Sequence, residues 1–305
     1  MKKKYYMTFI FVVMFCICNM HIAVGATSYF ETKKDGRDII LTKYTGNSST
    51  VYVPQNVTII NGAFCNNKHI KKIILGRNVK NIYDGSFNNL KNLKSVVLSK
   101  NLKLIEKGAF KKCPKVKKIV IPKRCESIGD WAFTGCTNLQ TLKVEKGSKY
   151  FKILQGALFS KDKKELICYP RKNKSRKSFT VPKSVKVIAS NAFKNNCYIE
   201  KIVVKGDAYD GGYDDIKAFT GMKKLKTVIF KTKQERDNIC FRKCKKLKTV
   251  KLKEGTQKIG KKQFQGCENL VNINFPKSLK VIEKKAFEGC KKLKLPIFDD
   301  NIKVN

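Results

Sequence analysis

A repeat of 23 residues is the feature that most constrains this chain. It is marked by phenylalanines in two runs, which are Phe64, Phe87, Phe110 and Phe133, then Phe193, Phe219, Phe241, Phe264 and Phe287. The first run is spaced by 23 throughout, and the second by 26, 22, 23 and 23. Self-similarity at such a period predicts a solenoid, in which stacked coils share one core. A repeat array grows as one body, so the length of 305 residues does not by itself predict two domains.

Apolar residues recur at fixed distances from each phenylalanine. After Phe110 they are Val116 at +6, Ile119 at +9 and Ile121 at +11. Alternation at +9 and +11 predicts a short strand with both side chains inward. The Gly-Ala-Phe-x-x-Cys segment predicts one or two helical turns on the opposite wall. One coil cannot bury its own apolar edge, so we expect the coils to stack with their strands parallel.

The repeats resemble the BspA-like leucine-rich repeat, a family of surface and secreted proteins of bacteria and some protists. The motifs are IEKGAFKKCPKVKKIVIP, IGDWAFTGCTNL and IEKKAFEGCKKL, and the match covers roughly residues 50–295. The stretch QGALFSKDKKELICYP at 155–170, followed by FTVP at 179–182, is similar to a β-hairpin that this family inserts between repeats. The resemblance implies a leucine-rich-repeat solenoid with an inserted hairpin, and adhesion to host matrix proteins, epithelial surfaces or other bacteria.

The expected organisation has four parts. Residues 1–26 have the pattern of a secretory signal peptide, with Lys2–Lys4, an apolar run from Met7 to Cys18 and small residues at 24–26. A membrane anchor is the alternative, but the apolar run is shorter than the roughly 20 residues that a spanning helix needs. Residues 27–58 are predicted as a capping hairpin, 59–295 as the array with an insert at 146–180, and 296–305 as a C-terminal cap or tail. In the hairpin, strands at 38–41 and 50–54 would flank a turn at 44–47.

The chain is strongly basic, with a formal net charge of +43. Loss of the three leader lysines would lower it by three, to +40. Outside a cell, such a charge favours anionic surfaces such as wall polymers, acidic glycans and lipid headgroups. We expect no specific nucleic-acid partner and no transmembrane segment in the mature protein.

Ten of the twelve cysteines follow the leader. In a secreted chain disulfides are the default expectation. Five cysteines, however, occupy the +3 position that Leu90 and Met222 fill in other repeats, which favours buried free thiols. Cysteines outside this column are expected to be the more reactive ones, and they are Cys65, Cys125, Cys168 and Cys240.

Little in the sequence favours catalysis. His69 is the one histidine after the leader, which leaves no His-rich metal site and makes a His-based dyad improbable. Four acids, Asp207, Asp210, Asp214 and Asp215, surround Gly211-Gly212, and a polar loop is favoured over a calcium site there. A carboxylate pair for glycoside hydrolysis is not marked anywhere. We therefore expect no enzyme, no cofactor and no metal.

The candidate binding residues are those that alternate with the inward ones along the strands. At +8, +10 and +12 they form β-branched positions bordered by lysines, namely Lys72, Ile74, Val97, Lys118, Val120, Lys143, Lys201, Val203, Ile229, Lys231 and Lys251. The plainer explanation is that β-branched residues favour strands. The alternative is that an apolar stripe with a cationic rim is a recognition surface.

These observations predict a secreted, non-catalytic protein that binds a host surface protein, a matrix protein or a glycan through its sheet face. The alternative is a wall-associated structural protein that is held on anionic cell-wall polymers by charge.

Overall fold

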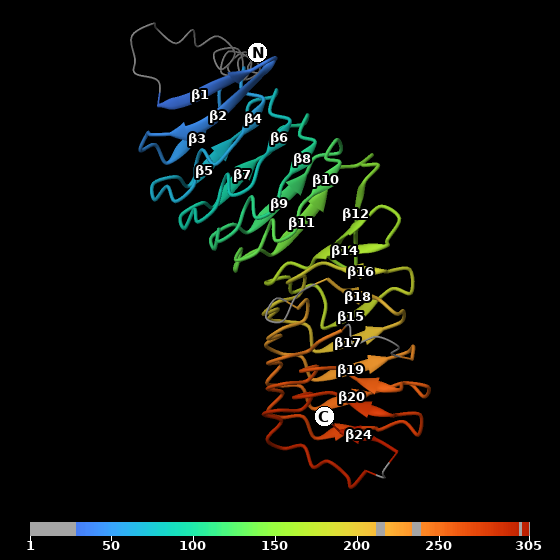
Figure 1. The fold of residues 1–305 in the computed structure, drawn as a ribbon. Coiled ribbons are helices and arrows are strands. Elements are labelled where there is room, and N and C mark those ends of the chain that lie inside the picture. The colour runs from blue at the N-terminus through green and yellow to red at the C-terminus, as the bar shows by residue number, and fades with distance from the viewer. Residues whose placement is uncertain (1–28, 212–216, 234–238, 299–300, 305) are drawn as a thin grey trace, which may run out of the picture.

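The computed structural model describes residues 29–211, 217–233, 239–298 and 301–304. The expected signal peptide, and Asp214 and Asp215 of the acidic cluster, lie outside these ranges. The described chain winds into a long solenoid of short strands with no helix, and hence with no helix that could cross a membrane (Figure 1). The predicted parallel-strand solenoid is confirmed.

One wall of the solenoid, the strand wall, is formed by the predicted +9 to +11 segments. Its strands pair in parallel within three sheets, because each coil presents the same backbone edge to the next. Their inward residues are buried, as Ile73, Ile119 and Ile202 show with 0 to 1% exposure. The strands of this wall are β3 (Thr50–Tyr52), β5 (Lys72–Ile74), β7 (Ser95–Val97), β9 (Lys118–Ile121), β11 (Thr141–Val144), β15 (Ser178–Val181), β17 (Lys201–Val204), β19 (Thr227–Phe230), β20 (Thr249–Lys251) and β22 (Asn272–Ile273).

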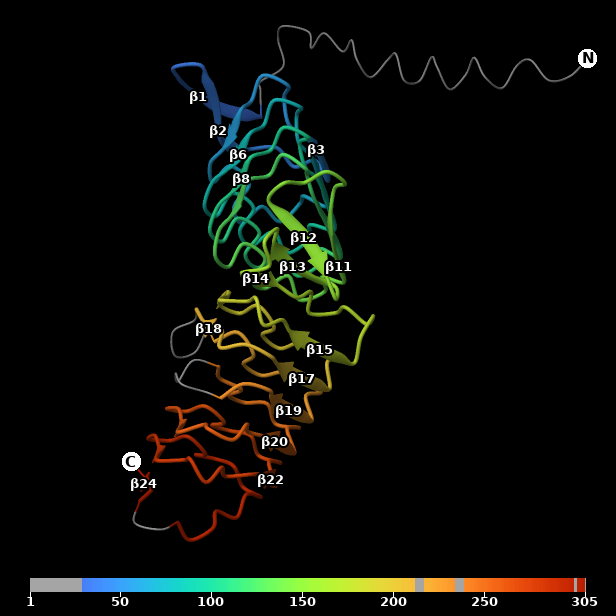
Figure 2. The ribbon, with the colours of Figure 1, turned by 90° about the vertical axis from the view of Figure 1, so that its right-hand side faces the viewer.

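A second wall consists of two-residue strands around position +18. Most of them contribute one inward side chain, such as Ile82 or Ile105, both 0% exposed. Figure 2 shows this wall on the opposite side of the solenoid from the strand wall. Its strands are β4 (Ile59–Ile60), β6 (Asn81–Ile82), β8 (Leu104–Ile105), β10 (Ser127–Ile128), β16 (Val187–Ile188), β18 (Tyr209–Asp210), β21 (Lys258–Ile259), β23 (Val281–Ile282) and β24 (Lys303–Val304). The last strand, β24, lies in the predicted tail and pairs in parallel with β23.

The phenylalanine segments form turns where helical turns were expected. Around Phe110, the N–H of Ala109 donates to Glu106 O at 3.2 Å and that of Lys111 to Gly108 O at 2.8 Å. Gly108 and Lys112, two residues before and after Phe110, have φ of 66° and 59°. Left-handed residues on both sides of the phenylalanine, which recur at Phe64, Phe87, Phe133, Phe193, Phe264 and Phe287, prevent the turns from continuing as a right-handed helix.

Phenylalanine rings and cysteine thiols connect these turns from coil to coil. Neighbouring rings stack, with centroids 4.9 Å apart for Phe87 and Phe110. The Cys113 thiol donates to Phe87 O of the preceding coil at 2.9 Å, and the Cys136 thiol to Phe110 O at 3.2 Å. The same bond recurs at Cys244, Cys267 and Cys290. All five +3 cysteines are free and buried, which confirms that this position holds core thiols.

The expectation for the other cysteines is partly wrong. Cys125 and Cys240 are buried, and burial raises the pKa of each thiol from 9.0 to about 12. Cys168 is half-buried, and burial raises the pKa of its thiol to about 12 as well. A neutral, enclosed thiol is a poor nucleophile. Of these four cysteines, Cys65 alone is exposed.

The N-terminal hairpin uses different strands from those predicted. It is formed by β1 (Phe30–Asp35) and β2 (Asp38–Tyr44), which pair antiparallel. β2 also pairs in parallel with β4, so the hairpin starts the second wall. The predicted partner at 50–54 contains β3, which pairs in parallel with β5 and belongs to the strand wall.

The insert repeats this arrangement in the middle of the chain. β12 (Phe151–Leu154), β13 (Ala157–Ser160) and β14 (Glu165–Cys168) form an antiparallel meander, and β14 pairs in parallel with β16 of the second wall. Tyr44, the last residue of β2, packs against Phe64 in a tilted arrangement with ring centroids 5.7 Å apart, and Tyr169, directly after the meander, stacks on Phe193 at 5.0 Å. The solenoid therefore consists of two blocks, each of which begins with a hairpin and a tyrosine ring.

The core is divided in the same way. One cluster of buried residues runs from Leu41 to Leu158, and a second runs from Ala157 to Cys290. They meet on β13, where Leu158 packs into the first cluster and Ala157 and Phe159 pack into the second.

Candidate binding face

The outer side of the strand wall is built by strict alternation. In β5, Ile73 points inward and is fully buried, while Lys72 is exposed and Ile74 is half-buried on the outer side. The parallel register places Ile74 beside Val97, so outward residues from successive coils form rows across the strands.

The predicted apolar residues of the first block lie on two sheets of this wall. Ile74 and Val97 are paired neighbours, and Val120 pairs with Lys143 on the adjoining strands β9 and β11. Val97 is 48% exposed, whereas Ile74 and Val120 are half-buried. Exposed apolar groups in a row on a solvated sheet are available to a partner.

The residues predicted in the second block form a separate row. Val203 pairs with Ile229, and Ile229 with Lys251. These strands belong to a different sheet from those of the first block. Figure 2 shows both sheets along the same side of the solenoid, with the β12–β13 part of the meander in front of the junction. The structure thus places ten of the eleven predicted residues on strands of this wall, in three sheets, and Lys231 directly follows β19.

Sequence reasoning missed Tyr52. The register pairs Tyr52 with Ile74, so its ring begins the apolar row of the first block. It is 64% exposed. Tyr52 precedes Ile74 by 22 residues, close to the repeat period, which would have placed it at the same outward position. The prediction of a hairpin strand at 50–54 excluded that assignment.

The lysines around these rows alternate with small hydroxyl residues. Lys72 is paired with Ser95, Lys118 with Thr141, and Lys201 with Thr227. All three lysines are exposed, and none has a carboxylate partner within the described parts of the chain. The rim of the face therefore carries uncompensated positive charge.

The other candidate sites have structural explanations. Asp210 is fully buried, and its Oδ1 accepts the N–H of Ala218 at 2.9 Å. His69 is exposed. The described residues contain no group of three or more His, Cys, Asp or Glu that could hold a metal ion.

Comparison with known proteins agrees with this architecture. The family described as "BspA type Leucine rich repeat region" matches residues 43–165 and 168–294, in six copies. No curated protein matches the chain.

Two similar solved structures are of bacterial leucine-rich repeat proteins. A leucine-rich repeat protein from Eubacterium ventriosum is 20% identical, covers 91% of each chain and has a TM-score of 0.61. A leucine rich cell surface protein from Faecalibacterium prausnitzii is 20% identical, covers 92% of this chain and 94% of the other, and has a TM-score of 0.57. At this identity the two likenesses show the shared fold.

Proposed function

This chain belongs to the BspA-type leucine-rich repeat family, and from that premise we propose that it is a non-catalytic binding protein of the cell surface or the extracellular space. Repeat proteins of this family are generally non-catalytic. The proposed contact surface is the outer side of the strand wall, and the proposed partner is an acidic protein or glycan surface.

The row of Tyr52, Ile74 and Val97 carries the proposal. Two of these side chains are about half or more exposed, 64% for Tyr52 and 48% for Val97, and hydrogen-bonded strand register keeps all three side by side. Protein interfaces combine such aromatic and apolar centres with a charged, solvated rim. Lys72 and Lys118 supply that rim, and attract negatively charged partners before contact.

The test is a double variant, Val120→Glu with Lys118→Glu, which reverses the charge and polarity at the centre of the face. A matched control is Val187→Glu with Lys186→Glu, because these exposed residues occupy the second wall. Binding to purified matrix proteins and to isolated cell wall is measured for both. We expect at least a tenfold loss for the first variant and no change for the control. Equal binding by two folded variants would refute the proposed face.

Electrostatic retention on a wall polymer is the second candidate, and the net charge of +43 favours it. Raising the salt from about 0.1 M to about 1 M shortens the screening length from ~10 Å to ~3 Å. Retention by charge alone should be lost over this range. Binding through the apolar row should largely survive.

A further inference from the structure

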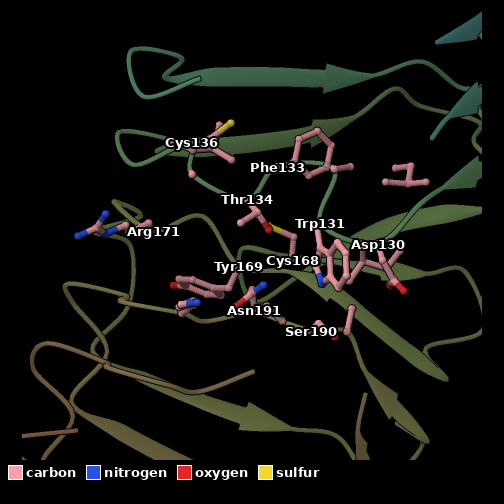
Figure 3. A pocket seen from close by; sticks show the side chains of 18 of the residues that line it. Asp130, Trp131, Phe133, Thr134, Cys136, Cys168, Tyr169, Arg171, Ser190 and Asn191 are labelled. Carbon is pink, nitrogen blue, oxygen red and sulfur yellow. The ribbon is translucent and has the colours of Figure 1, made fainter. Parts of the chain in front are cut away.

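A cavity of about 220 Å³ lies between the two blocks. Phe133, the last ring of the first stack, and Tyr169, the first ring of the second, both line it. Figure 3 shows Cys168, Tyr169 and Asn191 near the middle of the view, with Trp131 beside them. The cavity thus occupies the place where the next coil of the first block would lie.

Two backbone donors face this cavity without an acceptor. In the coil before, the N–H of Phe110 donates to Ala132 O and that of Lys112 to Thr134 O, both at 2.8 Å. Phe133 and Gly135 hold the same two positions in their coil. Their N–H groups have no acceptor among the described residues. Because these N–H groups point to the following coil, and the cavity is there, the two donors are directed into it.

Trp131 adds a third donor under backbone strain. Its φ is 59°, a left-handed conformation that a bulky residue rarely adopts and that Gly62, Gly85 and Gly108 hold at the same position of earlier coils. Its indole Nε1 is buried and has no hydrogen-bond partner. Asn191, Lys262 and Lys285 hold the same left-handed conformation at this position of later coils, so the backbone strain belongs to the repeat. An unpaired buried polar group costs about 1–3 kcal/mol of stability. A ligand that accepts a hydrogen bond from the indole would regain that free energy.

The second block contributes an acceptor and a positive charge. Asn191 Oδ1 is buried, lines the cavity and has no hydrogen-bond partner. The Arg171 Nε donates to Asn195 O at 3.0 Å, which fixes the guanidinium at the cavity wall. In Figure 3, Arg171 lies on the same side of the view as Cys136, and Asp130 lies on the opposite side.

We propose that this cavity binds the carboxyl-terminal end of a peptide. A carboxylate only accepts hydrogen bonds, which suits the N–H groups of Phe133 and Gly135, and Arg171 adds a positive charge to the lining. The last peptide N–H of the ligand would donate to Asn191 Oδ1. The volume is below the roughly 300–1,000 Å³ of a site for a drug-sized molecule, so it admits a short terminus and not a folded domain. This site is separate from the strand wall and does not depend on the function proposed for it.

Trp131 is the one tryptophan of the chain, so its fluorescence reports directly on the cavity. The probes are N-acetyl-Ala-Leu with a free carboxylate and the same peptide as its C-terminal amide. We expect a saturable change in emission with the carboxylate, and at least tenfold weaker binding of the amide. No saturable change with the carboxylate, or equal affinities for the two peptides, would overturn the proposal.

Two arginine variants test the charge. Arg171→Gln should weaken binding of the carboxylate peptide at least tenfold. Arg124→Gln, which removes an exposed arginine whose guanidinium bonds to Asn101, should leave it unchanged. Thermal unfolding of both variants confirms that they are folded. The strand-wall variant Val120→Glu should bind the peptide normally, and a folded Arg171→Gln protein with unchanged affinity would argue against the site.

Discussion

Replacing Cys113 by valine removes one polar hydrogen from the core at nearly constant volume. The thiol is fully buried and donates to Phe87 O at 2.9 Å. Loss of such a hydrogen bond costs about 1 kcal/mol. At pH 7 we therefore expect Cys113→Val to be less stable than the parent protein by about that amount.

At alkaline pH, Cys113→Val should become the more stable of the two proteins. Burial raises the pKa of Cys113 from 9.0 to about 12. A raised pKa in the folded state means that the stabilisation is complete below pH 9 and is lost as the pH rises toward 12, because the unfolded chain then releases the proton first. At pH 10.5 the buried thiol should lower the free energy of unfolding of the parent protein by about 2 kcal/mol relative to pH 7. The valine variant lacks this titrating group and should not show that loss. The two free energies of unfolding should cross at about pH 9.6.

Urea unfolding under reducing conditions at pH 7, 9 and 10.5 provides the measurement. Met222→Leu is the control, because Met222 fills the same +3 position without a titrating group and is also fully buried. Its effect should not vary with pH. A difference between Cys113→Val and the parent that stays constant from pH 7 to 10.5 would refute the reasoning.

Three further substitutions test the packing, and urea unfolding measures each of them. Phe110→Ala removes a fully buried ring from the stack and should cost about 3–5 kcal/mol; a loss below 1 kcal/mol would mean that the rings are not packed. Gly76→Ala places a Cβ 2.6 Å from Pro54 O, and the forced backbone shift should cost about 1–3 kcal/mol, so an unchanged midpoint would contradict the close approach. Asp210→Ala leaves the N–H of Ala218 without its carboxylate and should cost about 1–3 kcal/mol, whereas a neutral result would show that water replaces the acceptor.

The strand wall could be predicted because two inward residues alternate in every coil. The second wall could not, since a two-residue strand contributes one inward side chain, such as Ile105, and shows no alternation. The turns around phenylalanine were expected to be helical because Lys112 and Trp131 give no sign of a left-handed backbone.

The candidate face was predicted as far as the repeat could be followed. Its rows come directly from alternation, but the first coil has no marker phenylalanine, because the ring there comes from Tyr44. That coil was therefore interpreted as part of a cap, and Tyr52 was overlooked. The cavity between the blocks depends on how the meander meets the last coil, which spacing along the chain does not encode.

The repeated hairpin-and-tyrosine start has a consequence for how the protein is assembled. In the first block the Tyr44 N–H donates to Ala63 O, and in the second the Tyr169 N–H donates to Ala192 O, both at 2.9 Å. The second block thus has its own initiating module, with its own core from Ala157 onward. Such a module makes the half that follows it a candidate unit for autonomous folding.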